Sequence, residues 1–239
     1  MIKAVLFDLD GTLLPMNQDL FVKTYFSSIT QKLSPLGYEP KKVIEALYGG
    51  MMAMVKNDGS VLNRVVFWNC FEKLFGAEAL NDKPVFDEYY KNEFQQVKDV
   101  CGFCKHSAEV IGLVKSKGAK VILATNPIFP SIATYSRVRW AGLDADDFDH
   151  ITTYDNSHFC KPNPNYYREI ISQFGLSADE CIMVGNDIGE DMAAGELGMK
   201  TFLLTDCLIA KNEADKEKYE HGGFDELAVF LENELCAAE

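Results

Sequence analysis

The spacing of apolar residues predicts a long helical stretch in the first half of the chain. Between residues 19 and 97, apolar side chains recur every three or four positions, and this period places them on one face of a helix. Turn-forming residues interrupt the stretch at 34–40, 57–60 and 81–84. The pattern therefore predicts four helices with no strand between them.

From residue 107 onward, short apolar runs alternate with helical segments. Together with the first apolar run of the chain, they predict buried strands at 3–8, 120–126, 149–154, 181–187 and 200–205. Such strands, joined by helices, form a doubly wound, Rossmann-like α/β layer with a parallel sheet. Since the strand at 3–8 belongs to that layer, the helical stretch is an insertion. We predict a core domain of residues 1–16 and 98–239 and a helical domain of residues 17–97.

Local signals predict where several helices begin and end. Ser107 is expected to cap a helix, and Asn163 followed by Pro164 predicts the start of another. Ser177 and Glu180 have the spacing of a capping box. Further helices are predicted at 131–140, 190–197 and 224–233.

The composition narrows the possible partners. Apolar residues make up 47% of the chain and the net charge is −13, which argues against binding to nucleic acid. A small phosphorylated ligand remains compatible, because a metal ion can reverse the charge of a site. No apolar run reaches the roughly 18 residues of a membrane helix, and Asp8 interrupts the N-terminal apolar run, unlike in a signal peptide. We expect a cytoplasmic protein with no membrane or nucleic-acid partner, and we predict no particular oligomeric state.

The cysteines favour free thiols in a reducing compartment. There are seven, an odd number scattered through the chain. Cys101 and Cys104 form the one close pair, with His106 nearby. A redox or metal site is the alternative interpretation of this pair, but a second CxxC is missing.

Candidate catalytic residues follow four of the predicted strands. They are Asp8 and Asp10 after the first, Thr125 and Asn126 after the second, Lys161 in the loop beyond the third, and Asp187 and Asp191 after the fourth. In open α/β sheets, ligands bind beyond the carboxyl ends of the strands. We therefore expect these side chains to converge on one site.

Each of these residue types suits phosphoryl transfer. Asp8 and Asp10 share a face of their strand, and crowded carboxylates repel each other unless a cation such as Mg²⁺ intervenes. Asp8 can attack phosphorus as a nucleophile, while Asp10 can protonate the leaving alcohol and later take a proton from water. Thr125, the backbone N–H of Asn126 and Lys161 can stabilise the phosphoryl oxygens.

These segments resemble the four motifs of the haloacid dehalogenase superfamily. The matching segments are DLDGT at 8–12, the strand end at Thr125, Lys161 in KPNP, and GNDIGED at 185–191. The resemblance covers nearly the whole chain and implies a Rossmann-like core with a helical C1-type cap. It also implies that Asp8 is the nucleophile and a Mg²⁺ ligand, and that Asp10 is the acid/base and binds the metal through its carbonyl. By the same resemblance, the acids of the fourth motif hold the metal.

The fourth motif departs from the commonest pattern of that superfamily, in which aspartate follows the glycine. Here Asn186 follows Gly185. We expect Asp187 to supply the main metal carboxylate, with Asp191 four residues later. The alternative is that Asn186 takes the ligand position and Asp191 compensates.

The resemblance implies a Mg²⁺-dependent phosphatase that acts on a small phosphorylated metabolite. An acid at Asp10 favours phosphoryl transfer over dehalogenation, because a halide leaves without a proton. The alternative is a sugar phosphomutase resembling β-phosphoglucomutase, which needs the same two aspartates and differs in its cap. The helical insertion shows no signature of the Schiff-base lysine that phosphonatase-like members use. Its candidate substrate-facing residues are Tyr25, Arg64, Trp68 and Tyr89, although the apolar and aromatic neighbours of each favour core packing instead. His158 is a further candidate from the core.

Two other classes of protein use similar residues. A response-regulator receiver also combines aspartates, a threonine and a lysine, but its phosphoacceptor lies on the third strand and no helical insertion follows its first strand. A non-catalytic phosphate-binding or interaction protein on the same fold is expected to have lost Asp8 or Asp10. Both aspartates are present here, which favours the enzyme.

Overall fold

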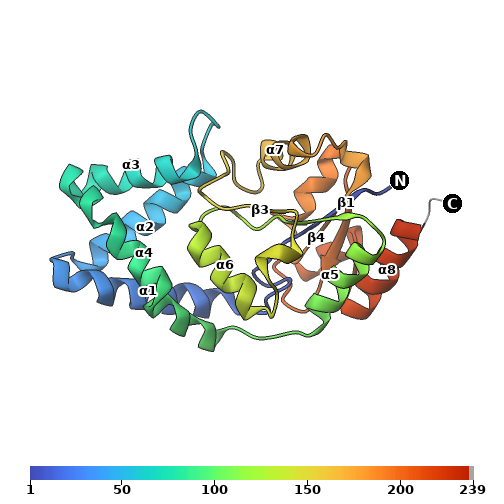
Figure 1. Cartoon of the computed structure of the whole chain (residues 1–239), viewed down its shortest axis with the longest axis horizontal. Helices are drawn as coiled ribbons and strands as arrows, with labels where there is room; N and C mark the ends of the chain where they lie inside the picture. Colours follow the sequence, from blue (N-terminus) through green and yellow to red (C-terminus); the bar gives the residue numbers. More distant parts are fainter. Residues whose placement is uncertain (237–239) are drawn as a thin grey trace.

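The computed structural model describes residues 1–236 and contains one sheet of six parallel strands in the order β3-β2-β1-β4-β5-β6. Helices lie on both faces of this sheet, and a helical body extends from one end of it (Figure 1). The strands are β1 (Ala4–Phe7), β2 (Lys120–Leu123), β3 (His150–Ile151), β4 (Cys181–Gly185), β5 (Lys200–Leu204) and β6 (Glu220–Gly222). The doubly wound α/β fold predicted from the sequence is confirmed.

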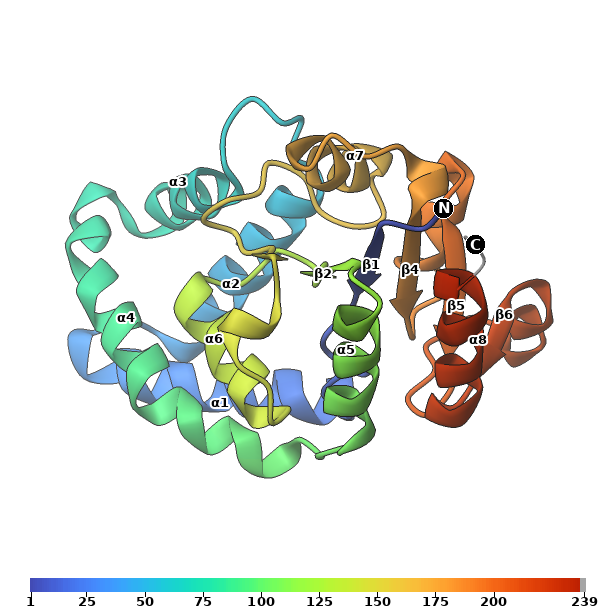
Figure 2. The ribbon, with the colours of Figure 1, turned by 45° about the vertical axis from the view of Figure 1, so that its right-hand side comes forward.

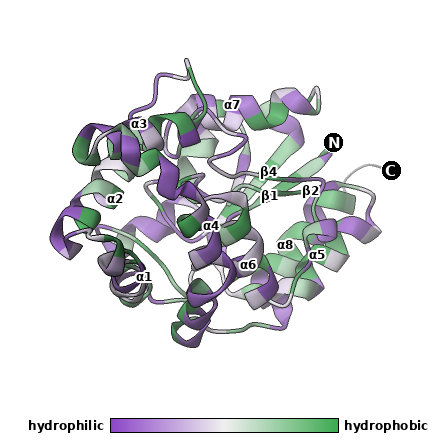
Figure 3. Ribbon diagram, turned by 60° about the vertical axis from the view of Figure 1, so that its left-hand side comes forward, coloured by the Kyte–Doolittle hydropathy of each residue, from purple (hydrophilic) through white to green (hydrophobic). Residues whose placement is uncertain are grey.

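Apart from Lys120 at the start of β2, the central strands carry no charged residue, because both faces of a parallel sheet are covered. All four residues of β1 are buried, and β1, β2 and β4 are drawn in the green of hydrophobic residues in Figure 3. In the register of the sheet, Phe7 lies between Leu123 of β2 and Val184 of β4. The carboxyl ends of these three strands therefore lie at one level.

Alternate residues of β1 face two different hydrophobic clusters. Val5 and Phe7 belong to the cluster that includes residues of α5 (His106–Ser116) and α8 (Phe224–Cys236). These two helices pack side by side (Figure 2). Ala4 and Leu6 belong to the cluster formed with α7 (Pro164–Gln173) and the 3₁₀ helix η6 (Met192–Leu197). Because successive side chains of a strand point to opposite faces, β1 contributes to the hydrophobic packing on both faces of the sheet.

Four α-helices lie between β1 and α5, with no strand among them, as predicted. They are α1 (Gln18–Leu33), α2 (Pro40–Val55), α3 (Asn63–Phe75) and α4 (Lys83–Lys91), joined by the 3₁₀ helices η1 (Ser34–Leu36) and η2 (Ala77–Asp82). The last predicted helix was expected to run on to residue 97, but the helix is broken at Asn92 (φ −113°, ψ −83°). It continues as η3 (Glu93–Val100), which still buries Phe94 and Val97. The predicted spacing of buried residues is therefore correct, but the predicted single helix is two elements in the structure.

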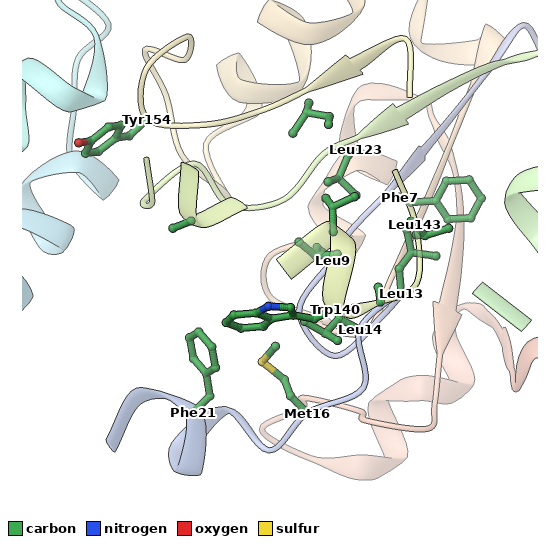
Figure 4. Packing of buried hydrophobic residues seen from close by; sticks show 14 of the residues in the cluster. Phe7, Leu9, Leu13, Leu14, Met16, Phe21, Leu123, Trp140, Leu143 and Tyr154 are labelled. Atoms are coloured by element: carbon green, nitrogen blue, oxygen red, sulfur yellow. The ribbon is translucent and has the colours of Figure 1, made fainter. Parts of the chain in front are cut away.

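The inserted helices leave the core and return to it at one place. Met16 forms an isolated antiparallel bridge with Cys101, and the N–H of Gly102 donates to the carbonyl of Pro15 at 2.7 Å. Figure 4 shows Met16 and Phe21 gathered near Trp140 of α6 (Ser131–Trp140). The helix α6 lies between the sheet and the inserted helices (Figure 1). The inserted helices and the core consequently share one continuous hydrophobic cluster.

Several local expectations are confirmed and others are wrong. The Asn163 side chain caps α7, and the capping box of Ser177 and Glu180 is present. Ser107 does not cap its helix, because α5 begins at His106 and the Ser107 hydroxyl donates to the carbonyl of Leu13 at 2.8 Å. The segment 190–197 is partly a 3₁₀ helix rather than an α-helix. Strand β6 was missed, since its polar sequence EHG lacks the apolar run of a buried strand.

The remaining elements are short. They are the 3₁₀ helices η4 (Ala145–Asp147), η5 (Ala178–Glu180) and η7 (Glu213–Lys218). All seven cysteines are free thiols, and the Cys101 thiol donates to the carbonyl of Val97 at 3.8 Å. Within residues 1–236, no helix has the length and apolar character needed to cross a membrane.

Candidate active site

The first predicted pair of carboxylates lies directly beyond β1. The N–H of Asp8 still donates to the carbonyl of Val184 at 2.9 Å, so the backbone of Asp8 extends the sheet. A tight turn follows, in which Gly11 has a φ of +91°. A Cβ atom on Gly11 would lie 2.3 Å from Nδ2 of Asn186. Glycine is therefore needed both for the positive φ and for the close approach of the two segments.

Lys161 forms the centre of the site. Its ammonium is buried and donates to Oδ1 of Asp8 at 2.8 Å and to Oδ1 of Asp191 at 2.6 Å. Burial alone lowers the pKa of Lys161, but the carboxylates of Asp191 and Asp8 raise it well above its usual value. The other oxygen of Asp8 accepts a hydrogen bond from the Thr12 hydroxyl at 3.2 Å. Asp8 is thus held at both oxygens beside a permanent positive charge.

Both oxygens of Asp191 are engaged. Oδ1 accepts from Lys161, and Oδ2 accepts from the N–H of Asp187 at 3.0 Å. Burial raises the pKa of Asp191 to about 7, although Lys161 opposes that rise. A Cβ atom on Gly185 would lie 2.1 Å from Oδ2 of Asp191. The glycine at the end of β4 therefore makes room for this carboxylate.

The neighbouring residues of the fourth motif have different surroundings. Oδ1 of Asn186 accepts from the Thr12 hydroxyl at 3.1 Å, and its Nδ2 donates to the carbonyl of Cys207 at 2.6 Å. Oδ1 of Asp187 accepts from the N–H groups of Gly189 and Glu190 at 2.7 and 3.1 Å. No hydrogen bond to Oδ2 of Asp187 is found within residues 1–236. One carboxylate oxygen of this motif therefore remains available to a ligand.

Asp10 pairs with an arginine that sequence reasoning missed. Arg137 of α6 is buried, and its guanidinium donates to Oδ2 of Asp10. The same guanidinium lies over the ring of Phe129, 4.4 Å from its centroid. Burial raises the pKa of Asp10, and the positive charge of Arg137 opposes this rise. The signal that could have found Arg137 is its place in a predicted helix one turn from the buried Ala133 and Trp140.

Oδ1 of Asp10 is buried and has no hydrogen-bond partner among the described residues. A buried carboxylate oxygen without a partner is costly unless a ligand or water satisfies it. Asp10 lines the same cavity as Asp8. The unpartnered oxygen is therefore consistent with a role in receiving a bound molecule.

Thr125 and Asn126 lie at the carboxyl end of β2, as predicted, and both line the cavity. The carbonyl of Thr125 accepts from the hydroxyls of Thr152 and Tyr166 at 2.6 and 2.9 Å. The side chain of Asn126 donates to Oε2 of Glu190 at 2.9 Å. Burial raises the pKa of Glu190 to about 7. Glu190 was missed as a site residue, although it lies inside the acidic segment that the sequence singled out.

A cavity of about 360 Å³ opens above these residues and extends between the inserted helices. Of the residues that were expected to face a substrate, Tyr25 and Trp68 line it. Arg64 lies outside this lining and is 4.0 Å from Asp155. Tyr89 is fully buried in the core, and the ring of His158 pairs with Glu169 at 2.6 Å. The structure thus brings together two of these five candidates.

The oxygen donors of the site fit a hard cation. Mg²⁺ prefers oxygen ligands and binds through one or two carboxylates while keeping several waters. Asp8, Asp10, Asn186 and Asp187 all line one end of the cavity, and both Asp10 and Asp187 have a carboxylate oxygen without a hydrogen-bond partner in the described chain. No group of three or more His, Cys, Asp or Glu residues among residues 1–236 has the geometry of a complete metal site. The donor set therefore suits a cation that also uses water and substrate oxygens.

Comparison with known proteins identifies the family of this chain. Residues 2–198 match the family model of the haloacid dehalogenase-like hydrolases. The glyceraldehyde 3-phosphate phosphatase of Methanothermobacter thermautotrophicus is 28% identical over 229 residues, which cover 94% of both chains. These matches span the core and the inserted helices alike.

Solved structures share the same fold. A HAD phosphatase from Thermococcus onnurineus aligns over 96% of this chain and 98% of its own, with 23% identity and a TM-score of 0.60. The HAD hydrolase YfnB of Bacillus subtilis, whose crystal structure is of a magnesium-bound form, aligns over 97% and 99% with 17% identity and a TM-score of 0.57. This chain therefore belongs to the haloacid dehalogenase-like hydrolases and is an enzyme of that family.

Proposed function

We propose that this enzyme is a Mg²⁺-dependent phosphatase that hydrolyses a small phosphorylated metabolite through an aspartyl-phosphate on Asp8. The observation that carries this proposal is the position of Asp8, which contacts the Lys161 ammonium at 2.8 Å and the Thr12 hydroxyl at 3.2 Å. Asp10 lines the same cavity. A nucleophile and an acid thus line one end of one cavity, and a buried cation contacts the nucleophile from behind the wall, which supports phosphoryl transfer.

In this mechanism, a carboxylate oxygen of Asp8 attacks the phosphorus of the substrate. The bond from phosphorus to the ester oxygen breaks as the new bond forms, and Asp10 gives its proton to the leaving alcohol. Asp10 then takes a proton from water, which attacks the phosphorus and releases phosphate from Asp8. Lys161, Thr125 and the N–H of Asn126 hold the phosphoryl oxygens and offset their negative charge.

A bound Mg²⁺ would lower the repulsion between the phosphoryl group and the surrounding carboxylates. We propose that Asp8, the carbonyl of Asp10 and Asp187 hold it. Asp191 has both oxygens engaged by Lys161 and the Asp187 N–H, which favours a positioning role for Asp191 over direct ligation. Asn186 remains the alternative ligand, since its Oδ1 faces Thr12 within the site.

We further propose that residues 17–97 act as a cap that selects the substrate, while residues 1–16 and 98–239 supply the chemistry. The cavity supports this division, since its lining combines residues of both parts. A cytoplasmic location stays a prediction. A sugar phosphomutase is the alternative within this fold, because the same two aspartates could return the phosphoryl group to the substrate rather than to water.

The test is the hydrolysis of p-nitrophenyl phosphate. Turnover should require Mg²⁺, stop with EDTA and return when Mg²⁺ is restored. Asp8→Asn should lower kcat by a factor on the order of 10⁴ or more, whereas Asp19→Asn, on the exposed surface of α1, should leave it unchanged. Full activity of Asp8→Asn would contradict the proposal. Absence of turnover with any phosphate monoester would favour a non-catalytic phosphate-binding protein, and an isomeric product without free phosphate would favour the mutase.

A further inference from the structure

The cavity has two chemically different ends. One end carries the carboxylates and amides of the proposed catalytic site. The rest of its wall consists of apolar and aromatic residues, with Gln18 as the exception. Aromatic rings predominate there, and they come from α1, α2, α3 and α4, from the loop before α6 and from the segment after β3. A molecule bound at the carboxylates would therefore extend into an apolar space.

The cavity wall contains no lysine, arginine or histidine among the described residues. The two nearby cations lie behind it and are already paired. Lys161 contacts Asp8 and Asp191, and Arg137 contacts Asp10. A second anionic group on the substrate would find no positive partner, and an unpaired buried charge is costly.

Two of the four tyrosines in the wall have hydroxyls that already bond within the protein, which leaves the hydroxyls of Tyr48 and Tyr154 to a sugar. The hydroxyls of Tyr25 and Tyr90 bond to each other at 2.8 Å, so each already has a partner. Burial raises the pKa of Tyr25 to about 12, which keeps this hydroxyl neutral. Several hydroxyls on a substrate would lose hydrogen bonds to water without equivalent replacement.

We infer that the substrate is the monophosphate ester of an apolar alcohol, with a ring or short hydrocarbon chain in the aromatic part of the cavity and no second charged group. This inference rests on the proposed phosphatase activity. The cavity volume of about 360 Å³ lies near the lower end for ligand sites, which span roughly 300–1,000 Å³. That size suits a body of about one ring, and rings pack edge-to-face or offset against aromatic walls.

The first experiment compares two substrates that differ only in a remote charge. They are 2-phenylethyl phosphate and its ring-carboxylated analogue, 2-(4-carboxyphenyl)ethyl phosphate, whose leaving oxygens are chemically alike. We expect kcat/KM to favour the neutral ester by about 100-fold or more, chiefly through KM, because the added carboxylate would be buried without a partner. Equal values for the two esters would overturn the inference.

The second experiment varies the apolar length. From ethyl to butyl phosphate, kcat/KM should rise by about fourfold for each methylene, since each buried CH₂ favours binding. Glyceraldehyde 3-phosphate and pyrophosphate should both be poorer substrates than 2-phenylethyl phosphate. Faster turnover of either would overturn the inference while leaving the phosphatase proposal intact, whereas no turnover of any monoester would overturn both.

A pair of variants tests the wall itself. Tyr48 on α2 lines the cavity and is exposed, whereas Ile44, also exposed on α2, lies outside the lining. Tyr48→Arg would give the carboxylate of the ring-carboxylated substrate a positive partner. The ratio of kcat/KM for the neutral ester to kcat/KM for the carboxylated ester should therefore fall at least tenfold. Ile44→Arg should leave the ratio unchanged. An unchanged ratio in Tyr48→Arg, or an equal shift in both variants, would contradict the assignment.

Discussion

The guanidinium of Arg137 donates a hydrogen bond to Asp10 across 127 residues of sequence. Arg137 is 1% exposed, and its partner oxygen belongs to the proposed general acid/base. Burying both charges is costly unless they remain paired. The pair also connects α6, which lies against the inserted helices, to the end of β1. Arg137 is therefore positioned to hold Asp10 at the cavity and to couple its placement to the packing of α6.

Loss of this arginine should destabilise the fold. Arg137→Met leaves the Asp10 carboxylate buried without its partner, so the free energy of unfolding should fall by about 3 kcal/mol. Urea denaturation measures this change. Arg139→Met, two residues away on the exposed side of α6, should change it by less than about 0.5 kcal/mol.

A double variant separates charge pairing from simple packing. Adding Asp10→Asn to Arg137→Met removes the stranded charge and should recover at least about 1 kcal/mol. If the double variant loses as much free energy of unfolding as the two single variants lose together, the two side chains are not energetically coupled.

The affinity for Mg²⁺ should identify the ligand in the fourth motif. Asp187→Asn removes the available carboxylate, so the Mg²⁺ concentration at half-maximal activity should rise by about 10- to 100-fold. Activity measured against Mg²⁺ concentration gives this value. A shift in Asn186→Ala with none in Asp187→Asn would instead assign the ligand position to Asn186.

The space beside Gly185 should be essential for activity. In Gly185→Ala, the new methyl group would overlap the Asp191 carboxylate, whose Oδ2 lies 2.1 Å from the Cβ position. Displacement of Asp191 also disturbs Lys161, so kcat should fall by about 100-fold, with a loss of about 1–3 kcal/mol in stability. In Gly195→Ala the nearest atom is Cγ2 of Thr201 at 3.5 Å, and activity should be retained. Wild-type kcat in Gly185→Ala would show that this carboxylate can move freely.

The half-buried imidazole of His150 should make stability depend on pH. Burial lowers the pKa of His150 from 6.5 in the folded protein, although the charge of Glu169 opposes this. The unfolded chain then binds a proton more readily, so the stabilising contribution is complete above pH 6.5 and is lost as the pH falls through the folded-state value. Urea midpoints at pH 7.5 and 5.5 should therefore differ less in His150→Gln than in the wild type. The side chain of His106 is 40% exposed, so His106→Gln provides the control and should behave as the wild type.

The sequence by itself predicted the strands and the candidate residues that follow them. Four of its five predicted strands have apolar runs long enough to identify, because a parallel sheet is buried on both faces. Asp8 and Asp10 directly follow the first run, and the sequence also predicts Lys161 and Asp191 as site residues. In the structure, the Lys161 ammonium lies 2.8 Å from Asp8 and 2.6 Å from Asp191. An apolar run and the polar residues that follow it are visible in a few consecutive residues, so the sequence is enough to predict them.

Only the tertiary structure decided what surrounds those residues. Helical spacing places Arg137, unlike Arg139, one turn from Ala133 and Trp140, which indicates a buried position but names no partner. Only the tertiary structure pairs its guanidinium with Asp10. Ser107 does not cap α5 because the helix already begins at His106, and its hydroxyl instead donates to the carbonyl of Leu13, which is distant in sequence. The apolar wall above the site likewise arises from separate helices that meet in space. Periodicity specifies which side of each helix is buried, but the contacts between helices depend on how the whole chain packs.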